Sequence, residues 1–205
     1  MEGFLMDITN NENNESEVRE AVLKYEEDGR YTYADYEGWN DGNRYELIDG
    51  FVYLMSAPSS IHQSISMELS KQLAVFLTGK QCRVFAAPFD VCLNGLGDED
   101  DTVVQPDILV VCDTTKIERK YCNGAPDMVI EILSPSTSSR DIFTKLNKYQ
   151  KAGVREYWVV DPDTMAVNVH ILENDCYVIH SYESEDEIAV TVLEGCVIKL
   201  PDVFQ

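Results

Sequence analysis

Apolar and polar residues follow one another along this chain in patterns that predict alternating helices and strands. An apolar stripe at helical spacing predicts a helix over about 59–79, formed by Ile61, Ile65, Leu69, Leu73 and Phe76. Asp49-Gly50 separates two shorter apolar runs within 44–55. This pattern is typical of a β-hairpin with a two-residue turn.

Strand-like runs and a second helix follow. Strands are expected over 82–93, 107–112, 127–133 and 154–160. Ser136 or Thr137 is expected to cap a helix that ends near Ala152, with Gly153 as its C-terminal cap. From about residue 165 the chain shows short β-runs with acidic turns. The order predicts a mixed α/β domain with a C-terminal β extension.

The length of 205 residues suits one domain, for which we expect 21–205. Residues 1–20 are polar and acidic, and we expect a disordered arm there. This arm lacks the pattern of a signal peptide, and no apolar run approaches the roughly 20 residues of a membrane helix. We therefore expect a cytoplasmic protein with no membrane contact. The six cysteines form no CxxC pair and are expected to be reduced thiols, mostly buried.

The formal net charge of −21 argues against a simple nucleic-acid binder, because phosphate binding relies on Lys and Arg. The acidic residues concentrate in 1–20, 98–101 and 183–187, which are most simply solvated segments. Basic residues gather around the second helix and could form a local patch. These are Lys116, Arg119, Lys120, Arg140, Lys145, Lys148 and Lys151.

Two carboxylates stand in runs that otherwise look buried. Asp107 opens Ile-Leu-Val-Val, and Glu131 lies inside Met-Val-Ile-Glu-Ile-Leu. Burying an unpaired carboxylate costs several kcal/mol, so each needs a partner such as a cation. Neighbouring strands would place the two carboxylates about 5–8 Å apart. That spacing suits a shared Mg²⁺.

The second helix adds polar groups on one face, because Asp141, Lys145 and Tyr149 follow at steps of four. Asp141 could hold Lys145, whose ammonium could point at a water or a phosphate. Tyr149 could donate a hydrogen bond or simply pack in the core. Taken singly, each group has a plain structural explanation: a strand-start turn for Asp107, a surface ion pair for Asp141 and Lys145. The interpretation as a metal-dependent site depends on all of these residues occurring together in this order.

In this order the residues resemble the Uma-two family of restriction-endonuclease-like bacterial proteins, within the PD-(D/E)xK nuclease superfamily. The similarity covers residues of about 30–200. The matching stretches are Tyr45-Glu46-Leu-Ile-Asp-Gly50, Ser60-Ile-His62-Gln63, Val104-Gln105-Pro106-Asp107, Val129-Ile-Glu131-Ile-Leu-Ser-Pro-Ser136, the Asp141, Lys145 and Tyr149 series, and Gly153-Val-Arg-Glu-Tyr-Trp-Val-Val-Asp-Pro162.

The resemblance implies a restriction-endonuclease-like mixed β-sheet core flanked by helices. It implies Mg²⁺ or Mn²⁺ held by Asp107, Glu131 and the backbone carbonyl of Ile132. Glu46 would be a further catalytic acid. The superfamily motif places lysine two residues after the glutamate, where this chain has Leu133, so the resemblance assigns the catalytic lysine to Lys145. His62 and Gln105 match family positions and are expected to line the cleft.

The leading hypothesis is therefore a metal-dependent endonuclease that hydrolyses DNA phosphodiesters through a metal-activated water. One alternative is a catalytically silent metal- or nucleic-acid-binding or assembly module with the same fold, which the net charge favours. Another is a metal hydrolase for a small phosphate ester. A homodimer is expected only by analogy, because cutting both strands often uses two sites.

Overall fold

The structure is a computed structural model that describes residues 30–134 and 139–205, without the side chains of 139–141. The expected acidic arm 1–20 and the expected helix caps Ser136 and Thr137 lie outside the described residues. Within the described part, no helix is long and apolar enough to cross a membrane.

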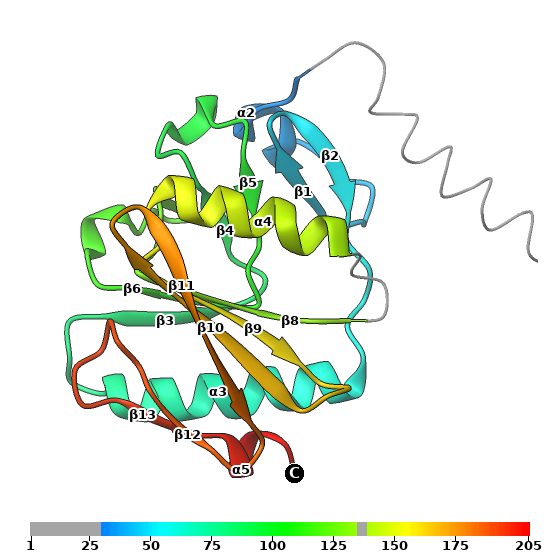
Figure 1. Ribbon diagram of the computed structural model, residues 1–205. Coiled ribbons are helices and arrows are strands. Elements are labelled where there is room, and N and C mark those ends of the chain that lie inside the picture. The colour runs from blue at the N-terminus through cyan, green and yellow to red at the C-terminus, as the bar shows by residue number, and fades with distance from the viewer. Residues whose placement is uncertain (1–29, 135–138) are drawn as a thin grey trace, which may run out of the picture.

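The centre of the molecule is a six-stranded mixed sheet in the order β11-β10-β9-β8-β6-β3 (Figure 1). Its strands are β3 (Arg83–Ala86), β6 (Ile108–Val111), β8 (Met128–Ile132), β9 (Glu156–Asp161), β10 (Ala166–Glu173) and β11 (Cys176–Glu183). β8 and β9 are parallel, and every other neighbouring pair in this sheet is antiparallel. The predicted mixed α/β order is thereby confirmed.

Two helices cover the opposite faces of this sheet (Figure 1). Helix α3 (Ser60–Leu77) buries Ile65, Leu69 and Leu73 against one face, and α4 (Ser139–Ala152) buries Tyr149 against the other. The alternation of a strand explains the two cores, because Ile108 and Val110 face α3 while Leu109 and Val111 face α4. The predicted stripe is wrong at Ile61, which is 62% exposed; His62 is the buried residue of that turn.

A second, five-stranded sheet has the order β2-β1-β5-β4-β7. It consists of β1 (Tyr45–Ile48), β2 (Phe51–Leu54), β4 (Asp90–Cys92), β5 (Val103–Val104) and β7 (Tyr121–Asn123). The predicted hairpin is confirmed, because β1 and β2 are antiparallel and joined by Asp49 and Gly50, both at positive φ. Short β5 and β7 were not anticipated.

The strand expected over 82–93 is wrong as one element, because it divides into β3 and β4 in different sheets. The Ala87–Pro88 bond, which is cis, lies between them. Proline has no N–H to donate to a strand ladder, so a continuous central strand is disfavoured there. The corner at 87–88 brings the two sheets together.

The expected C-terminal β extension is only partly separate from the core. Its first two strands, β10 and β11, belong to the central sheet. Only β12 (Glu187–Ala189) and β13 (Val197–Lys199) pair apart from it, followed by α5 (Leu200–Val203). The buried carboxylate of Glu156 accepts hydrogen bonds from Trp158 Nε1 at 2.8 Å and Val192 N at 2.9 Å. The Val192 bond joins the segment between β12 and β13 to β9 of the central sheet. The remaining short helices are α2 (Tyr33–Glu37), η1 (Gly97–Glu99) and η2 (Thr114–Lys116).

The cysteines correct another expectation. Cys82 and Cys112 form a disulfide next to the paired ends of β3 and β6, so the prediction of six reduced thiols is wrong for these two. Cys92, Cys122 and Cys196 are free and buried, and Cys176 is free and exposed. The expectation of buried thiols is confirmed for three residues.

The C-terminal cap of α4 yields a stability prediction. Gly153 has φ 86°, and its N–H donates to the Tyr149 carbonyl at 3.1 Å. Among residues 30–134 and 139–205, no atom lies within 4 Å of a Cβ added at this position, so Gly153→Ala tests backbone strain. We expect a loss of about 1–2 kcal/mol in the free energy of unfolding, measured by urea denaturation. Gly38→Ala, at φ −79°, is the matched control and should change little; equal losses in both variants would contradict this explanation.

Candidate active site

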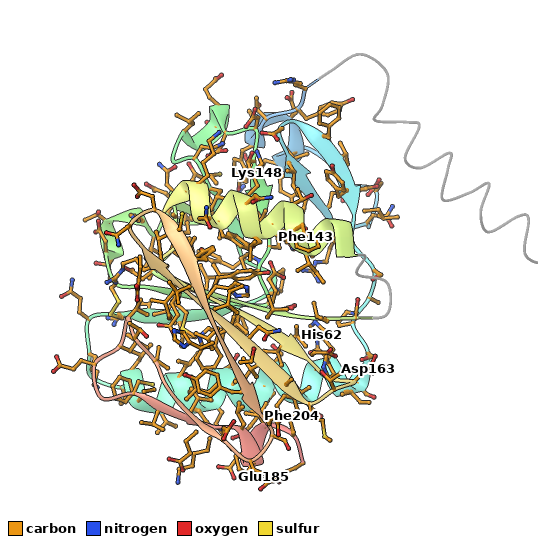
Figure 2. The ribbon with its side chains drawn as sticks, viewed as in Figure 1. His62, Phe143, Lys148, Asp163, Glu185 and Phe204 are labelled. Carbon is orange, nitrogen blue, oxygen red and sulfur yellow. A yellow bond between two sulfur atoms is a disulfide. The ribbon has the colours of Figure 1, made fainter. Side chains whose placement is uncertain are left out.

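Seven of the predicted site residues lie around one cavity of about 400 Å³, whereas Tyr149 is not among its lining residues. Its walls come from hairpin β1–β2, the first turns of α3, the ends of β6 and β8 that face this hairpin, and α4. Glu46, His62, Gln105, Asp107, Glu131, Ile132 and Lys145 all line it. Figure 2 labels His62 at the start of α3 and Lys148 on α4, on either side of the central sheet. Segments distant in the sequence thus supply one site.

Asp107 is held in position by backbone and side-chain donors. It precedes β6, which pairs with β8 in a register that places Asp107 beside Glu131. Its Oδ2 accepts the Ile132 N–H at 2.8 Å and lies 3.1 Å from His62 Nε2. The His62 turn is itself fixed by Ser59, whose hydroxyl accepts the His62 N–H at 3.2 Å as the helix N-cap. These bonds leave Asp107 with a defined orientation.

Glu131 and Glu46 share one cation. Lys145 Nζ donates to Glu46 Oε1 at 2.8 Å and to Glu131 Oε1 at 3.0 Å. Tyr149, one helical turn after Lys145, donates its hydroxyl to the same Glu131 oxygen at 2.7 Å. Tyr149 is fully buried, so it both packs in the core and supports the site.

Burial and charge determine the protonation states of this group. Burial raises the pKa of Glu131 to about 7, although the ammonium of Lys145 opposes the shift. Burial disfavours the ammonium form of Lys145, but the charges of Glu131 and Glu46 outweigh it and raise its pKa. Lys145 therefore stays cationic at neutral pH. The hydrogen bond to Asp107 raises the pKa of His62.

Gln105 organises a network that the sequence did not indicate. Its backbone N–H donates to Glu46 Oε1 at 2.9 Å, and its side-chain oxygen accepts from Arg44 Nε at 3.0 Å and Nη2 at 2.7 Å. Its amide nitrogen donates to Tyr36 and Asp90, each at 2.7 Å. Arg44 could have been found by strand alternation, since it directly precedes β1 and stands two residues before Glu46, on the same face.

The predicted contact between Asp141 and Lys145 stays a prediction. The side chain of Asp141 is outside the described residues, and the partners found for Lys145 are the two glutamates. His62 Nδ1 is buried and has no hydrogen-bond partner among residues 30–134 and 139–205.

The residues present fit a small divalent cation with few protein ligands. Asp107 Oδ1 and Glu131 Oε2 have no hydrogen-bond donor among the described residues, and neither atom is fully buried. No three His, Cys, Asp or Glu side chains in the described part are grouped closely enough for an all-side-chain metal cluster. Mg²⁺ usually takes one or two carboxylates and retains several waters. Two carboxylates and the Ile132 carbonyl meet that requirement.

Comparisons with known proteins agree with the family that the motifs indicated. Residues 31–201 match the model of the Uma2 family, described as "Putative restriction endonuclease". The "Uncharacterized protein slr1290" of Synechocystis is 26% identical over 158 residues, 75% of this chain and 81% of that protein. A crystal structure from Anabaena variabilis, described as "a putative nuclease belonging to DUF820", aligns with a TM-score of 0.68 at 21% identity. The alignment covers 84% of this chain and 97% of that chain and shows a common fold. The chain belongs to the Uma2 family.

Proposed function

We propose that this protein is a metal-dependent nuclease that hydrolyses DNA phosphodiester bonds. The observation that carries the proposal is that Asp107, just before β6, lies beside Glu131 of the adjacent β8, whose carboxylate accepts from the Lys145 ammonium. Two carboxylates and one lysine that line the same cavity are the groups suited to metal-dependent hydrolysis of a phosphodiester. Membership of a family described as restriction endonucleases supports the same reaction class.

Asp107, Glu131 and the carbonyl of Ile132 would hold the Mg²⁺ or Mn²⁺ ion. Such an ion, when bound, lowers the pKa of a water and neutralises charge on the phosphate. The protein's own part is positional, since the Ile132 N–H and His62 hold Asp107, and Tyr149 holds Glu131. This arrangement needs little reorganisation during the reaction.

Lys145 would stabilise the negative charge that develops on the phosphate. Its ammonium is held from two sides by Glu46 and Glu131, so it cannot swing away into solvent. Glu46 would keep the lysine protonated and aligned, and Gln105 in turn holds Glu46 through its backbone N–H. We assign Glu46 and Gln105 as positioning residues for the lysine.

A second candidate is a catalytically silent module of the same fold. The specific observation in its favour is that several cations of the basic patch expected around α4 already have partners within the protein. Lys148 pairs with Asp49, Lys120 pairs with Glu37, and Lys116 bonds to a backbone carbonyl. A chain of formal charge −21 with paired cations attracts a polyanion weakly.

Metal removal tests the proposal against this alternative. We expect linear DNA to be cleaved in Mg²⁺ or Mn²⁺, with cleavage abolished by EDTA and restored by excess metal. Products would be resolved on denaturing gels at low salt, where phosphate contacts are strongest. Cleavage that persists unchanged in EDTA would contradict metal dependence. Metal binding without cleavage of any DNA form would favour the silent module.

A further inference from the structure

One face of hairpin β1–β2 carries an unusual set of side chains over the candidate active site. In its antiparallel register Glu46 lies opposite Tyr53, and the Met55 N–H donates to the Arg44 carbonyl at 2.9 Å. Residues directly opposite one another across a ladder point to the same face. Arg44, Glu46, Tyr53 and Met55 all line the cavity. A cation, an aromatic ring and a thioether therefore surround the acid that binds Lys145.

Arg44 presents an oriented cation that makes no direct ion pair among the described residues. Its Nε and Nη2 donate to the neutral amide oxygen of Gln105, which fixes the guanidinium plane without cancelling its charge. No acceptor among the described residues is bonded to Nη1. A planar, preoriented guanidinium is well suited to a phosphate oxygen.

The cavity is otherwise poor in free cations. Arg44 and Lys145 are the only Lys or Arg side chains among its described lining residues, and Lys145 is bonded to two glutamates. Binding along a duplex usually involves several phosphate contacts and depends strongly on their number. One available guanidinium is too few to hold a duplex backbone, so the remaining affinity must come from another part of the ligand.

Apolar surface at the mouth of the cavity can supply that affinity. Tyr53, Leu54 and Met67 line it and are 43%, 40% and 70% exposed. Bases stack on aromatic side chains in single-strand-binding proteins, largely irrespective of sequence. A space of about 400 Å³ falls within the size range of small organic ligand sites. A space of this size suits one nucleotide whose base is unpaired.

We infer that the cavity face of hairpin β1–β2 binds one unpaired nucleotide, with its base against Tyr53 and a neighbouring phosphate on Arg44. The substrate class is then single-stranded DNA, or DNA with unpaired ends or flaps, in preference to continuous duplex. This inference rests on the proposed nuclease function, because it names the substrate of the same site. It also explains how an acidic protein can engage a polyanion through few ionic contacts.

Fluorescence anisotropy tests the inference independently of cleavage. A labelled single strand of about 12 nucleotides and a hairpin duplex of the same sequence would be titrated at low salt. One series contains EDTA and the other Ca²⁺, which also takes oxygen ligands. We expect the single strand to bind at least tenfold more tightly than the duplex. Arg44→Ala should make the dependence of log affinity on log salt concentration less steep, by the amount expected for the loss of about one phosphate contact.

Variants on the same strand separate stacking from general effects. Tyr53→Ala should weaken single-strand binding about tenfold, whereas Tyr53→Phe, which keeps the ring, should remain within twofold of the wild type. Phe51→Ala is the matched control, since Phe51 is 58% exposed on β2 but does not line the cavity.

The outcomes distinguish this inference from the proposed function. Equal or tighter duplex binding, or no binding to either form, would overturn the inference even if the protein cleaves DNA. An equal effect of Tyr53→Ala and Phe51→Ala would also overturn it. Selective single-strand binding without cleavage in Mg²⁺ or Mn²⁺ would support the nucleotide site and contradict the nuclease proposal.

Discussion

Replacement of Lys145 by alanine is expected to lower the rate of DNA cleavage at least a hundredfold. The ammonium is the cation that would meet the developing phosphate charge, and losing one preorganised donor of this kind costs about 10²–10³ in rate. Initial rates on a labelled single strand in Mn²⁺ would measure the effect. Cleavage within tenfold of the wild-type rate would contradict the assignment.

The same variant should also be less stable, with a defined pH dependence. Glu46 and Glu131 would lose their shared cation, and breaking a buried pair costs about 3–5 kcal/mol. Without Lys145 the pKa of Glu131 would rise further above 7, so the carboxyl would bind a proton more readily in the folded state. The destabilisation should therefore be largest at pH 8 and smaller at pH 5.5. Urea unfolding at the two pH values measures it.

Lys148→Ala provides the control for the lysine experiment. Lys148 lies on the same helix and pairs with Asp49, which is mostly exposed. A pair of this kind contributes at most about 1 kcal/mol, so this variant removes an equal charge with little loss of stability. Its cleavage rate should stay within a few-fold of the wild type. A loss comparable to that of Lys145→Ala would indicate a general effect of charge rather than a specific role.

Glu131→Gln is expected to weaken Mn²⁺ binding and to abolish cleavage while preserving the fold. The amide keeps the size of the side chain and an oxygen that can accept from Tyr149, but it loses the charge that would hold the ion. Calorimetric titration should show at least a tenfold weaker Mn²⁺ affinity. Unchanged Mn²⁺ affinity would contradict the placement of the metal site.

The pH dependence of binding gives a second readout for Glu131. Burial raises the pKa of this carboxyl to about 7, so its protonated fraction grows as the pH falls below 7. The proton must leave before an ion can bind, and wild-type affinity should fall about tenfold per pH unit in that range. The dependence should flatten in Glu131→Gln. Glu156→Gln is the control, because Glu156 is also buried but bonds to Trp158 and Val192 outside the cavity.

The positions of Asp107 and Glu131 illustrate what sequence patterns can predict. Each carboxylate stands at a strand position whose neighbours are apolar, and adjacent strands bring such positions together. Their proximity was predictable once the two strands were taken to be neighbours, which the structure shows them to be. The Asp49-Gly50 turn and the Gly153 cap were predictable for a related reason, since both depend on local backbone conformations that few residues adopt.

The partners of Lys145 could not be predicted in the same way. The four-residue spacing pointed to Asp141, whose side chain lies outside the described residues. The partners of Lys145 among the described residues are Glu131 and Glu46, which is 99 residues away from it. Arg44, Gln105 and Asp90 likewise meet only because β1, β4 and β5 share a sheet. Periodicity describes which face a side chain takes, but it does not show which distant segment lies opposite.

The division of residues 82–93 between two sheets and the disulfide between Cys82 and Cys112 could not be predicted for the same reason. An apolar run indicates burial without indicating in which sheet, and two cysteines become neighbours only when β3 pairs with β6. The sequence by itself determined the mixed α/β order, the family and the acids and lysine of the candidate site. Only the tertiary structure decided that Lys145 binds two glutamates and that Arg44 and Tyr53 line the same cavity as these glutamates. Hydrophobic patterning and turn chemistry act locally, whereas ion pairs and cavities form between segments whose approach depends on the packing of the whole chain.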